Sequence, residues 1–337
     1  MLVNTEFGQF SDWSYTTAAA IYLFAMIFFL IEQSFGQRGR QAAERAQQRS
    51  RELVGAGGPD LSTVLPGVRQ GTADVSDSNA TVGTPPGRAE RFGRMGVALT
   101  VLGALVHLAA LLLRGLAAGR VPWGNMYEYT MAVCFVAVVT WLVVLTKNPV
   151  RHLSAFVLLP IVILMFIGGT MLYTTAAPVQ PALQSYWLVI HVSAAIASSG
   201  VFLVPGVASV LYLMRSAHEK DPDRFSRFGS RLPAREVLDR IAYRTTVLAF
   251  PVFTFGVLCG AVWAEAAWGR FWGWDPKETV AFIAWVIYAA YLHSRATAGW
   301  RGDRAAVINV LGFAMMVFNL FFINLVTTGL HSYAGVG

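Results

Sequence analysis

Residues 153–173 carry no charged side chain and read Leu153-Ser-Ala-Phe-Val-Leu-Leu-Pro160-Ile-Val-Ile-Leu-Met-Phe-Ile-Gly-Gly-Thr170-Met-Leu-Tyr173. A helix of about 20 apolar residues spans the roughly 30 Å hydrocarbon core of a membrane. Similar runs recur along the chain, and the predicted spans are 14–33, 95–114, 127–146, 153–173, 186–214, 242–263, 277–294 and 305–328. The sequence therefore predicts an all-α fold, a polytopic membrane helix bundle of about eight transmembrane helices.

The composition supports this interpretation and excludes several classes of protein. The chain is 55% hydrophobic and 13% charged, whereas soluble domains carry roughly 25% charged residues. No contiguous stretch is free to form a soluble catalytic domain of about 100 residues, and no Walker A or dinucleotide-binding motif occurs. Cys134 and Cys259 lie far apart inside apolar runs. Without a C-x-x-C-H motif, the chain is not itself a c-type cytochrome.

The distribution of basic residues predicts the domain organisation and the orientation. Residues 1–33 are expected to be a retained N-terminal transmembrane helix, and 95–337 to be the main membrane domain. The region 34–94 is basic and polar, so it is expected to be a largely disordered cytoplasmic linker, with an amphipathic helix from Arg38 to Leu53 as the alternative for its first part. Most of the 26 Lys and Arg residues lie in this linker and the loops 147–152, 215–240 and 295–304. By the positive-inside rule these loops are cytoplasmic and both termini are outside. The net charge of +7 thus reflects topology, and no nucleic-acid partner is expected.

A tryptophan-rich segment connects the sixth and seventh predicted spans. It is expected to be an external loop over residues 263–278, and it reads Trp263-Ala-Glu-Ala-Ala-Trp268-Gly-Arg270-Phe-Trp272-Gly-Trp274-Asp275-Pro-Lys277-Glu278. Asp275, Pro276 and Glu278 form a typical helix start with a capping box. The alternation of indole rings with small residues would form a flat apolar shelf, for which a porphyrin is a suitable ligand. A belt of interfacial tryptophans is the structural alternative.

Two histidines are expected on the same membrane face as this loop. His191 lies about five residues into the fifth span and His331 follows the eighth. Neutral imidazole is a common iron ligand, so the pair suggests the axial ligands of a haem. Zinc is less favoured because no third ligand accompanies them. His293 ends the seventh span at the inner side. His107 lies in the middle of the second span, and its side chain is expected either to form a hydrogen bond between helices or to be a ligand deep in the membrane.

Several motifs together resemble a known family. The segment 268–278 is similar to the tryptophan-rich "WWD" signature of haem-handling proteins. The segments at His191-Val-Ser, Leu292-His293-Ser-Arg295, His331-Ser-Tyr and Pro122-Trp-Gly-Asn125-Met-Tyr-Glu128 resemble those of the CcsA/ResC-type cytochrome c biogenesis proteins of System II. The resemblance covers about residues 95–337. It implies a function in cytochrome c maturation, in the plasma membrane of a bacterium, with the active site on the outer face.

The resemblance also implies roles for individual residues. His191 and His331 would ligate the iron of haem b at the outer site, and His293 would ligate it at a transmembrane site. The haem would lie against Trp263, Trp268, Trp272, Trp274 and Asp275, with Arg270 and Lys277 as candidates for the propionates, and Asn125 and Glu128 as further binding residues. No side-chain nucleophile is expected, because the thiolates of the substrate react.

The implied partners are a CcsB/ResB-type membrane protein, apocytochrome c with its C-x-x-C-H motif, a thioredoxin-like thiol reductant and membrane lipid. Together they would form a holocytochrome c synthase, a haem lyase that makes thioether bonds. Three alternatives remain at this point: a System I haem-delivery protein with the same tryptophan signature, a cytochrome b-type electron-transfer subunit, and a transporter of another amphipathic anion.

Overall fold

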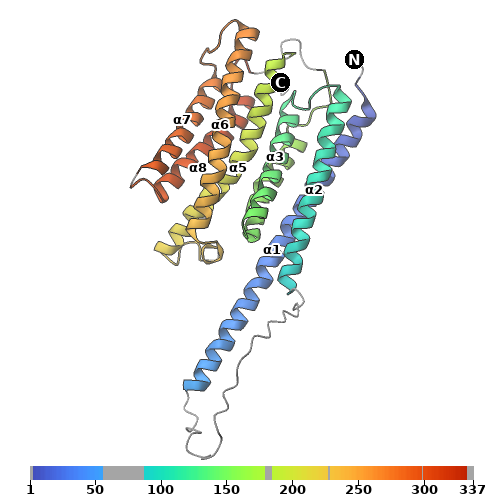
Figure 1. Cartoon of the computed structure of the whole chain (residues 1–337). Helices are drawn as coiled ribbons and strands as arrows, with labels where there is room; N and C mark the ends of the chain where they lie inside the picture. Colours follow the sequence, from blue (N-terminus) through green and yellow to red (C-terminus); the bar gives the residue numbers. More distant parts are fainter. Residues whose placement is uncertain (1–2, 56–86, 179–183, 227, 298, 332–337) are drawn as a thin grey trace, which may run out of the picture.

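A computed structural model describes residues 3–55, 87–178, 184–226, 228–297 and 299–331, with the backbone alone for 36–55. The described residues are predominantly helical and contain no strand. The long helices, shown in Figure 1, are α1 (Thr5–Gly55), α2 (Arg88–Ala118), α3 (Met126–Lys147), α4 (Ser154–Thr170), α5 (Tyr186–Lys220), α6 (Arg235–Trp268), α7 (Pro276–Ala296) and α8 (Asp303–Phe318). Short helical segments are η2 (Arg151–Leu153), η4 (Gly229–Arg231) and η5 (Asn319–Ile323). The predicted all-α membrane bundle is confirmed.

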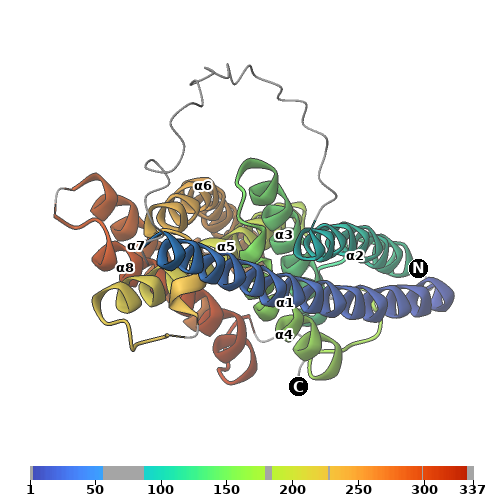
Figure 2. The same ribbon diagram turned by 90° about the horizontal axis from the view of Figure 1, so that it is seen from below.

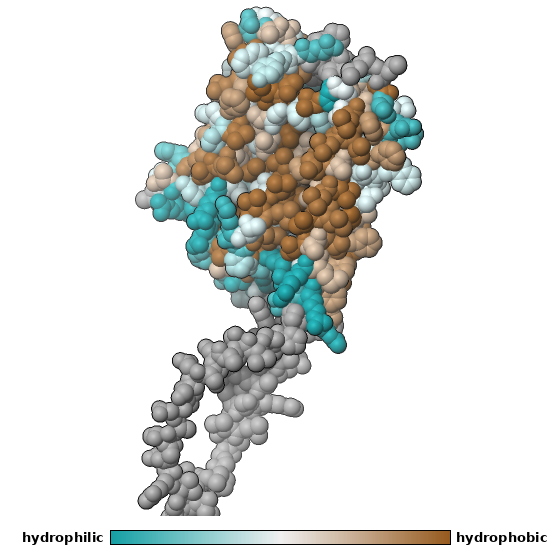
Figure 3. Space-filling view, turned by 45° about the vertical axis from the view of Figure 1, so that its right-hand side comes forward, coloured by the Kyte–Doolittle hydropathy of each residue, from teal (hydrophilic) through white to brown (hydrophobic). Residues whose placement is uncertain are grey.

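Seven of these helices are long and apolar enough to cross a membrane, namely all except α7. Helix α7 has 21 residues, carries Lys277 and Glu278 in its first turn and His293 and Arg295 in its last, and is not among these seven. Among the described residues, seven of the eight predicted spans therefore correspond to helices of this kind, and the predicted span 277–294 corresponds to α7, which is not of this kind. On the face in Figure 3, apolar side chains form a broad belt bordered by hydrophilic residues.

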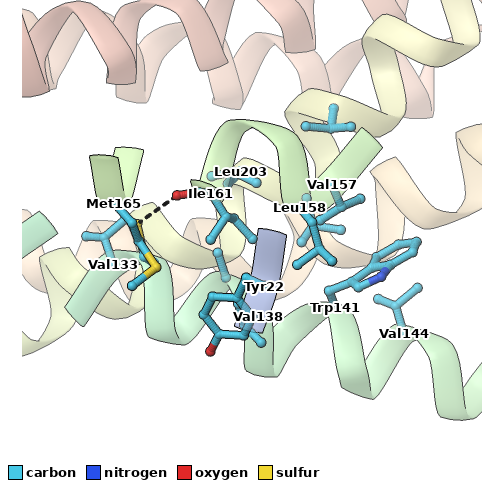
Figure 4. Packing of buried hydrophobic residues seen from close by; sticks show 14 of the residues in the cluster. Tyr22, Val133, Val138, Trp141, Val144, Val157, Leu158, Ile161, Met165 and Leu203 are labelled. Atoms are coloured by element: carbon cyan, nitrogen blue, oxygen red, sulfur yellow. Dashed lines mark hydrogen bonds between the residues drawn. The ribbon is translucent and has the colours of Figure 1, made fainter. Parts of the chain in front are cut away.

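The helices pack as two groups joined through α5. Helices α1 and α2 run side by side, and α4 packs against α1 and α3 (Figures 1 and 2). Helix α5 contacts α3 on one side and α6 and α8 on the other, while α7 packs against α8. The larger core, part of which Figure 4 shows, includes Tyr22, Trp141 and Leu158. The smaller core joins α5, α6 and α7 through Phe202, whose ring stacks on Tyr288 with centroids 3.9 Å apart.

Two ends of the bundle can be distinguished. The described parts of the loops between α2 and α3, α4 and α5, and α6 and α7 lie at one end, here called the Trp-loop end. The described parts of the loops between α3 and α4, α5 and α6, and α7 and α8 lie at the other, the basic end. The N–H of Asn4 donates to the carbonyl of Ala117, 3.0 Å away, which holds the start of the chain at the Trp-loop end. His331, near the end of the chain, lies there too, beside Trp268. The first and last described residues of the chain therefore lie at the same end of the bundle.

Two boundaries differ from those predicted. Helix α1 continues to Gly55 and α2 begins at Arg88, so both ends of the expected linker 34–94 are helical, and residues 56–86 lie outside the described residues. Helix α6 continues to Trp268, so the expected loop 263–278 is helical in its first part. The run Ala264-Glu-Ala-Ala267 favours helix, and Gly269 ends it with φ 71°, in the left-handed region where glycine carries no Cβ penalty.

Candidate functional site

A cavity of about 470 Å³ lies between the helices near the Trp-loop end. Its walls come from α3, α4, α5, α6 and α8, with the start of α7 and the segment after η5 closing one side. They are mainly aliphatic and aromatic. Among the predicted site residues, the cavity is lined by Asn125, His191, Trp263, Trp268, Trp272, Lys277 and His331. A largely apolar cavity of this size with a few polar groups is typical of a site for a small molecule or cofactor.

The two expected outer histidines lie beside one buried indole. The ring of His191 is nearly parallel to that of Trp263, at an interplanar angle of 7° and a centroid distance of 6.4 Å. The ring of His331 is 6.1 Å from the same indole and 5.1 Å from that of Trp268. Trp263 is only 2% exposed, so its position is fixed by packing. The fold thus brings together residues separated by most of the C-terminal half of the chain.

A hydrogen bond fixes the tautomer of each imidazole. Nδ1 of His191 lies 2.7 Å from the carbonyl oxygen of Gly256, and Nδ1 of His331 lies 2.8 Å from Oδ2 of Asp275. With Nδ1 donating, the neutral ring carries its lone pair on Nε2. Such outer hydrogen bonds orient histidines that bind metals. The pair is therefore suited to ligating an iron ion.

The electrostatic environment of His331 favours its neutral form. Burial lowers the pKa of this imidazole, the positive charge of Lys277 lowers it further, and Asp275 opposes both, with a net shift below the ordinary value. Burial alone would raise the pKa of Asp275, but the hydrogen bonds from Leu330 N–H and His331 outweigh burial and lower it. Asp275 is therefore a carboxylate acceptor beside a neutral histidine.

Asp275 also builds the turn that carries the tryptophans. Its side chain accepts from the N–H of Lys277, and Glu278 accepts from the N–H of Asp275 at 3.1 Å, which together form the predicted capping box of α7. Glu278 accepts in addition from Gly273 N–H at 2.9 Å and pairs with Arg270 at 3.3 Å. The backbone of the loop is thus folded around one carboxylate.

The tryptophans and cations of the loop do not all face the cavity. Trp263, Trp268 and Trp272 line it, whereas Trp274 does not and is 65% exposed, with a left-handed φ of 58°. Arg270 packs over the ring of Trp268 outside the cavity lining. Lys277 does line the cavity, and its Nζ donates to Asn324 Oδ1.

The predicted residues before α3 have separate roles. Asn125 lines the cavity and caps α3 by accepting from Glu128 N–H at 2.9 Å. Glu128 is fully buried and does not line the cavity. Its carboxylate accepts hydrogen bonds from Arg114 Nε at 3.0 Å, from Arg120 Nη1 at 2.7 Å and from the N–H of Gly124 at 2.8 Å. Glu128 therefore braces the loop that presents Asn125.

Two further histidines lie apart from this cavity. His293 is exposed near the basic end of α7. His107 is fully buried in the core formed by α1, α2 and α3. Its Nδ1 lies 3.4 Å from Tyr22 Oη, and the centroid of its ring lies 5.6 Å from that of the Phe135 ring. Neither residue lines the cavity. The structure thus groups His191 with His331 and separates both from the other two.

Several lining residues were not predicted. Trp123 lies within the Asn125 motif and Tyr129 directly after it, and the Trp123 Nε1 atom has no hydrogen-bond partner among the described residues. The π-helical segment η5, with Asn324 after it, forms another wall. Trp123 could have been found from its place in the motif Pro122-Trp-Gly-Asn125. The π-helix has no sequence signal, although such segments often occur at functional sites.

Known proteins share this sequence and fold. Residues 123–331 match the family described as Cytochrome C assembly protein. The cytochrome c biogenesis protein CcsA of Chlamydomonas reinhardtii is 36% identical over 236 residues, which are 68% of this chain and 65% of that protein. CcsA of Parasynechococcus marenigrum (strain WH8102) is 36% identical over 264 residues, 70% of this chain and 85% of that protein. CcsA of Guillardia theta is 33% identical over 257 residues, 71% of this chain and 85% of that protein.

A solved structure has the same fold. The cytochrome c heme lyase CcmF superposes with a TM-score of 0.56 at 17% identity, over 95% of this chain and 47% of that one. This chain thus corresponds to about half of that protein, and the likeness concerns the fold alone. The family match spans the cavity from Trp123 to His331, and relatives are 33–36% identical over 85% of their length. The chain therefore belongs to the cytochrome c assembly family, as a CcsA-type cytochrome c biogenesis protein.

Proposed function

We propose that the cavity binds haem b, with His191 and His331 as the two axial ligands of its iron, and presents it for attachment to apocytochrome c. The observation that carries this proposal is the placement of two imidazoles, each held through Nδ1, beside one indole at an apolar cavity. Neutral histidines on an apolar, aromatic wall suit haem as a substrate. They offer too few ligands for a structural zinc site.

The residues of the cavity have distinct roles in this proposal. Trp263, Trp268 and Trp272 supply the apolar wall against which the porphyrin lies. Lys277 is the cation that lines the cavity and is suited to a propionate. Arg270 pairs with Glu278, so its role is to hold the loop. Trp274, exposed at the surface, is suited to contact a protein partner.

The chemistry that follows uses groups of the cytochrome. Each cysteine thiol of a C-x-x-C-H segment adds across one vinyl group, the sulfur to one carbon and the proton to the other, so no oxidant is consumed. The chain itself would contribute position and orientation, which can supply about 7–11 kcal/mol. A thioredoxin-like reductant would keep the two thiols reduced beforehand. In this role the chain is one subunit of a haem lyase.

The location and the partner belong to the same proposal. The positive-inside rule places the basic end in the cytoplasm and the Trp-loop end on the outer face of a bacterial plasma membrane. The exposed His293, near the basic end, is suited to ligate haem together with a residue of a CcsB/ResB-type partner. This System II assignment is supported by the similarity to CcsA proteins.

An absorption spectrum tests the outer site. The full chain, co-purified with its membrane partner, is expected to show the spectrum of bis-histidine haem. His191→Ala and His331→Ala should each alter this spectrum, and added imidazole should restore it. The matched control is His218→Ala, because His218 lies at the basic end, outside the cavity. An unchanged spectrum in both cavity variants would rule out the outer ligands.

A further inference from the structure

A second cavity, of about 370 Å³, lies between α3 and α6 near the basic end. Its walls are Phe135, Val136, Val139, Thr140, Val143, Val144, Ile241, Thr245 and Leu248, and its polar end is formed by Lys147, Asn148, Arg240 and Arg244. The two helices belong to different halves of the bundle, and each packs mainly against α5. The space between them is therefore a groove on the side of the bundle.

Three cations gather at one end of this groove. Lys147 lies in the last turn of α3, and Arg240 and Arg244 are one helical turn apart on α6. All three side chains are exposed, and none makes an ion pair with another described residue. By contrast, the neighbouring Arg295 pairs with Asp239 at 2.8 Å. The groove thus presents uncompensated positive charge next to an apolar wall.

The apolar wall is open to the membrane. Val139, Val143 and Leu248 are 39%, 49% and 63% exposed, so the wall is not covered by the rest of the chain. Basic pockets between transmembrane helices at the cytoplasmic side bind the headgroups of anionic lipids. We propose that this groove binds an anionic phospholipid, with its phosphate at Lys147, Arg240 and Arg244 and an acyl chain along Val139, Val143 and Leu248.

The chemistry of the groove favours a lipid over a haem. None of its lining residues is a histidine, cysteine, methionine or tyrosine, so the iron of a haem would have no axial ligand there. The histidine cavity lies toward the opposite end of the bundle and has a different lining. This lipid site is therefore independent of the proposed haem function.

Native mass spectrometry of the full-length protein tests the proposal. The protein is loaded from detergent micelles that contain either phosphatidylglycerol or phosphatidylcholine. We expect one phosphatidylglycerol to be retained selectively. The triple variant Lys147→Gln, Arg240→Gln, Arg244→Gln should lose on the order of 100-fold in affinity, because each interfacial cation contributes roughly fivefold toward anionic lipid. Val139→Trp keeps the charges but fills the groove, and should also weaken binding.

The matched control carries the same change of charge outside the groove. Arg88→Gln, Arg91→Gln, Arg231→Gln removes three exposed cations at the basic end and should retain phosphatidylglycerol as the parent does. Equal retention of the two lipids, or equal loss in the control and the groove variants, would overturn the proposal. So would displacement of the lipid by haemin at equal concentration. The haem spectrum is a separate readout, since the groove variants should leave it unchanged.

Discussion

Nδ1 of His331 lies 2.8 Å from Oδ2 of Asp275, the residue that also caps α7 and accepts the N–H of Leu330 at 2.7 Å. One carboxylate thus connects the tryptophan-rich turn, the start of α7 and the end of the chain. The aspartate of the tryptophan motif thus caps a helix and also holds the imidazole of His331, the proposed haem ligand. This relationship explains why the motif and a histidine 56 residues later belong to one site.

Asp275→Asn should weaken haem binding while preserving the fold. The amide is the same size, but it removes the charge that orients the imidazole and fixes its tautomer. Loss of such a support costs about 10- to 100-fold in metal affinity. Haem titration followed by absorbance measures this change. Asp303→Asn, which removes a carboxylate paired with Lys220 at the basic end, should bind haem normally, and equal weakening in both variants would contradict the role of Asp275.

Gly260→Ala should displace His191, the other proposed ligand. A Cβ at this position would lie 2.7 Å from Cε1 and Nδ1 of His191, which is closer than real Cβ contacts, so the imidazole would have to move away from the Gly256 carbonyl. We expect a mixture of low-spin and high-spin haem in the absorption spectrum. Gly8→Ala is the control, because a Cβ there meets nothing within 4 Å. A normal spectrum in Gly260→Ala would show that His191 is not held in this position.

The sequence predicted the elements of this site better than their three-dimensional relationships. Runs of apolar residues located the helices, because the hydrocarbon core sets a length that is visible in composition. The capping box was predicted because Asp275 and Glu278 interact across one turn. The contact between His331 and Asp275 joins distant parts of the chain, and no local rule specifies it. Glu128 was predicted from the resemblance alone, and its burial between Arg114 and Arg120 depends on packing that no local sequence rule specifies.

Trp272→Ala and Trp274→Ala should have different effects. Trp272 lines the cavity, whereas Trp274 is 65% exposed and does not. We expect Trp272→Ala to reduce the amount of haem that co-purifies with the protein, because it removes apolar wall from the site. Trp274→Ala should keep its haem and reduce instead the yield of holocytochrome c in cells. The opposite pattern would show that the exposed indole of Trp274, rather than that of Trp272 in the cavity wall, contacts the haem.

Glu128→Gln should destabilise the whole Trp-loop end. The carboxylate is fully buried and pairs with Arg114, itself 1% exposed, and with Arg120. Neutralising it leaves the buried Arg114 with only the more distant Asp12, 3.5 Å away, as an acidic partner, a change that costs up to about 3–5 kcal/mol. Thermal unfolding in detergent should show a large decrease in Tm, with loss of haem from the same preparation, since Asn125 and its loop depend on this brace.

Glu32→Gln is the matched control for that experiment. Glu32 also pairs with an arginine, Arg151, at 2.6 Å, but the two side chains are 14% and 32% exposed. Water near the basic end can solvate the arginine once the carboxylate is gone, so the loss should be about 1 kcal/mol or less. Similar decreases in Tm for the two variants would mean that Glu128 contributes no more than a surface ion pair. The brace would then have to come from the capping interaction of Asn125, which Asn125→Ala measures separately.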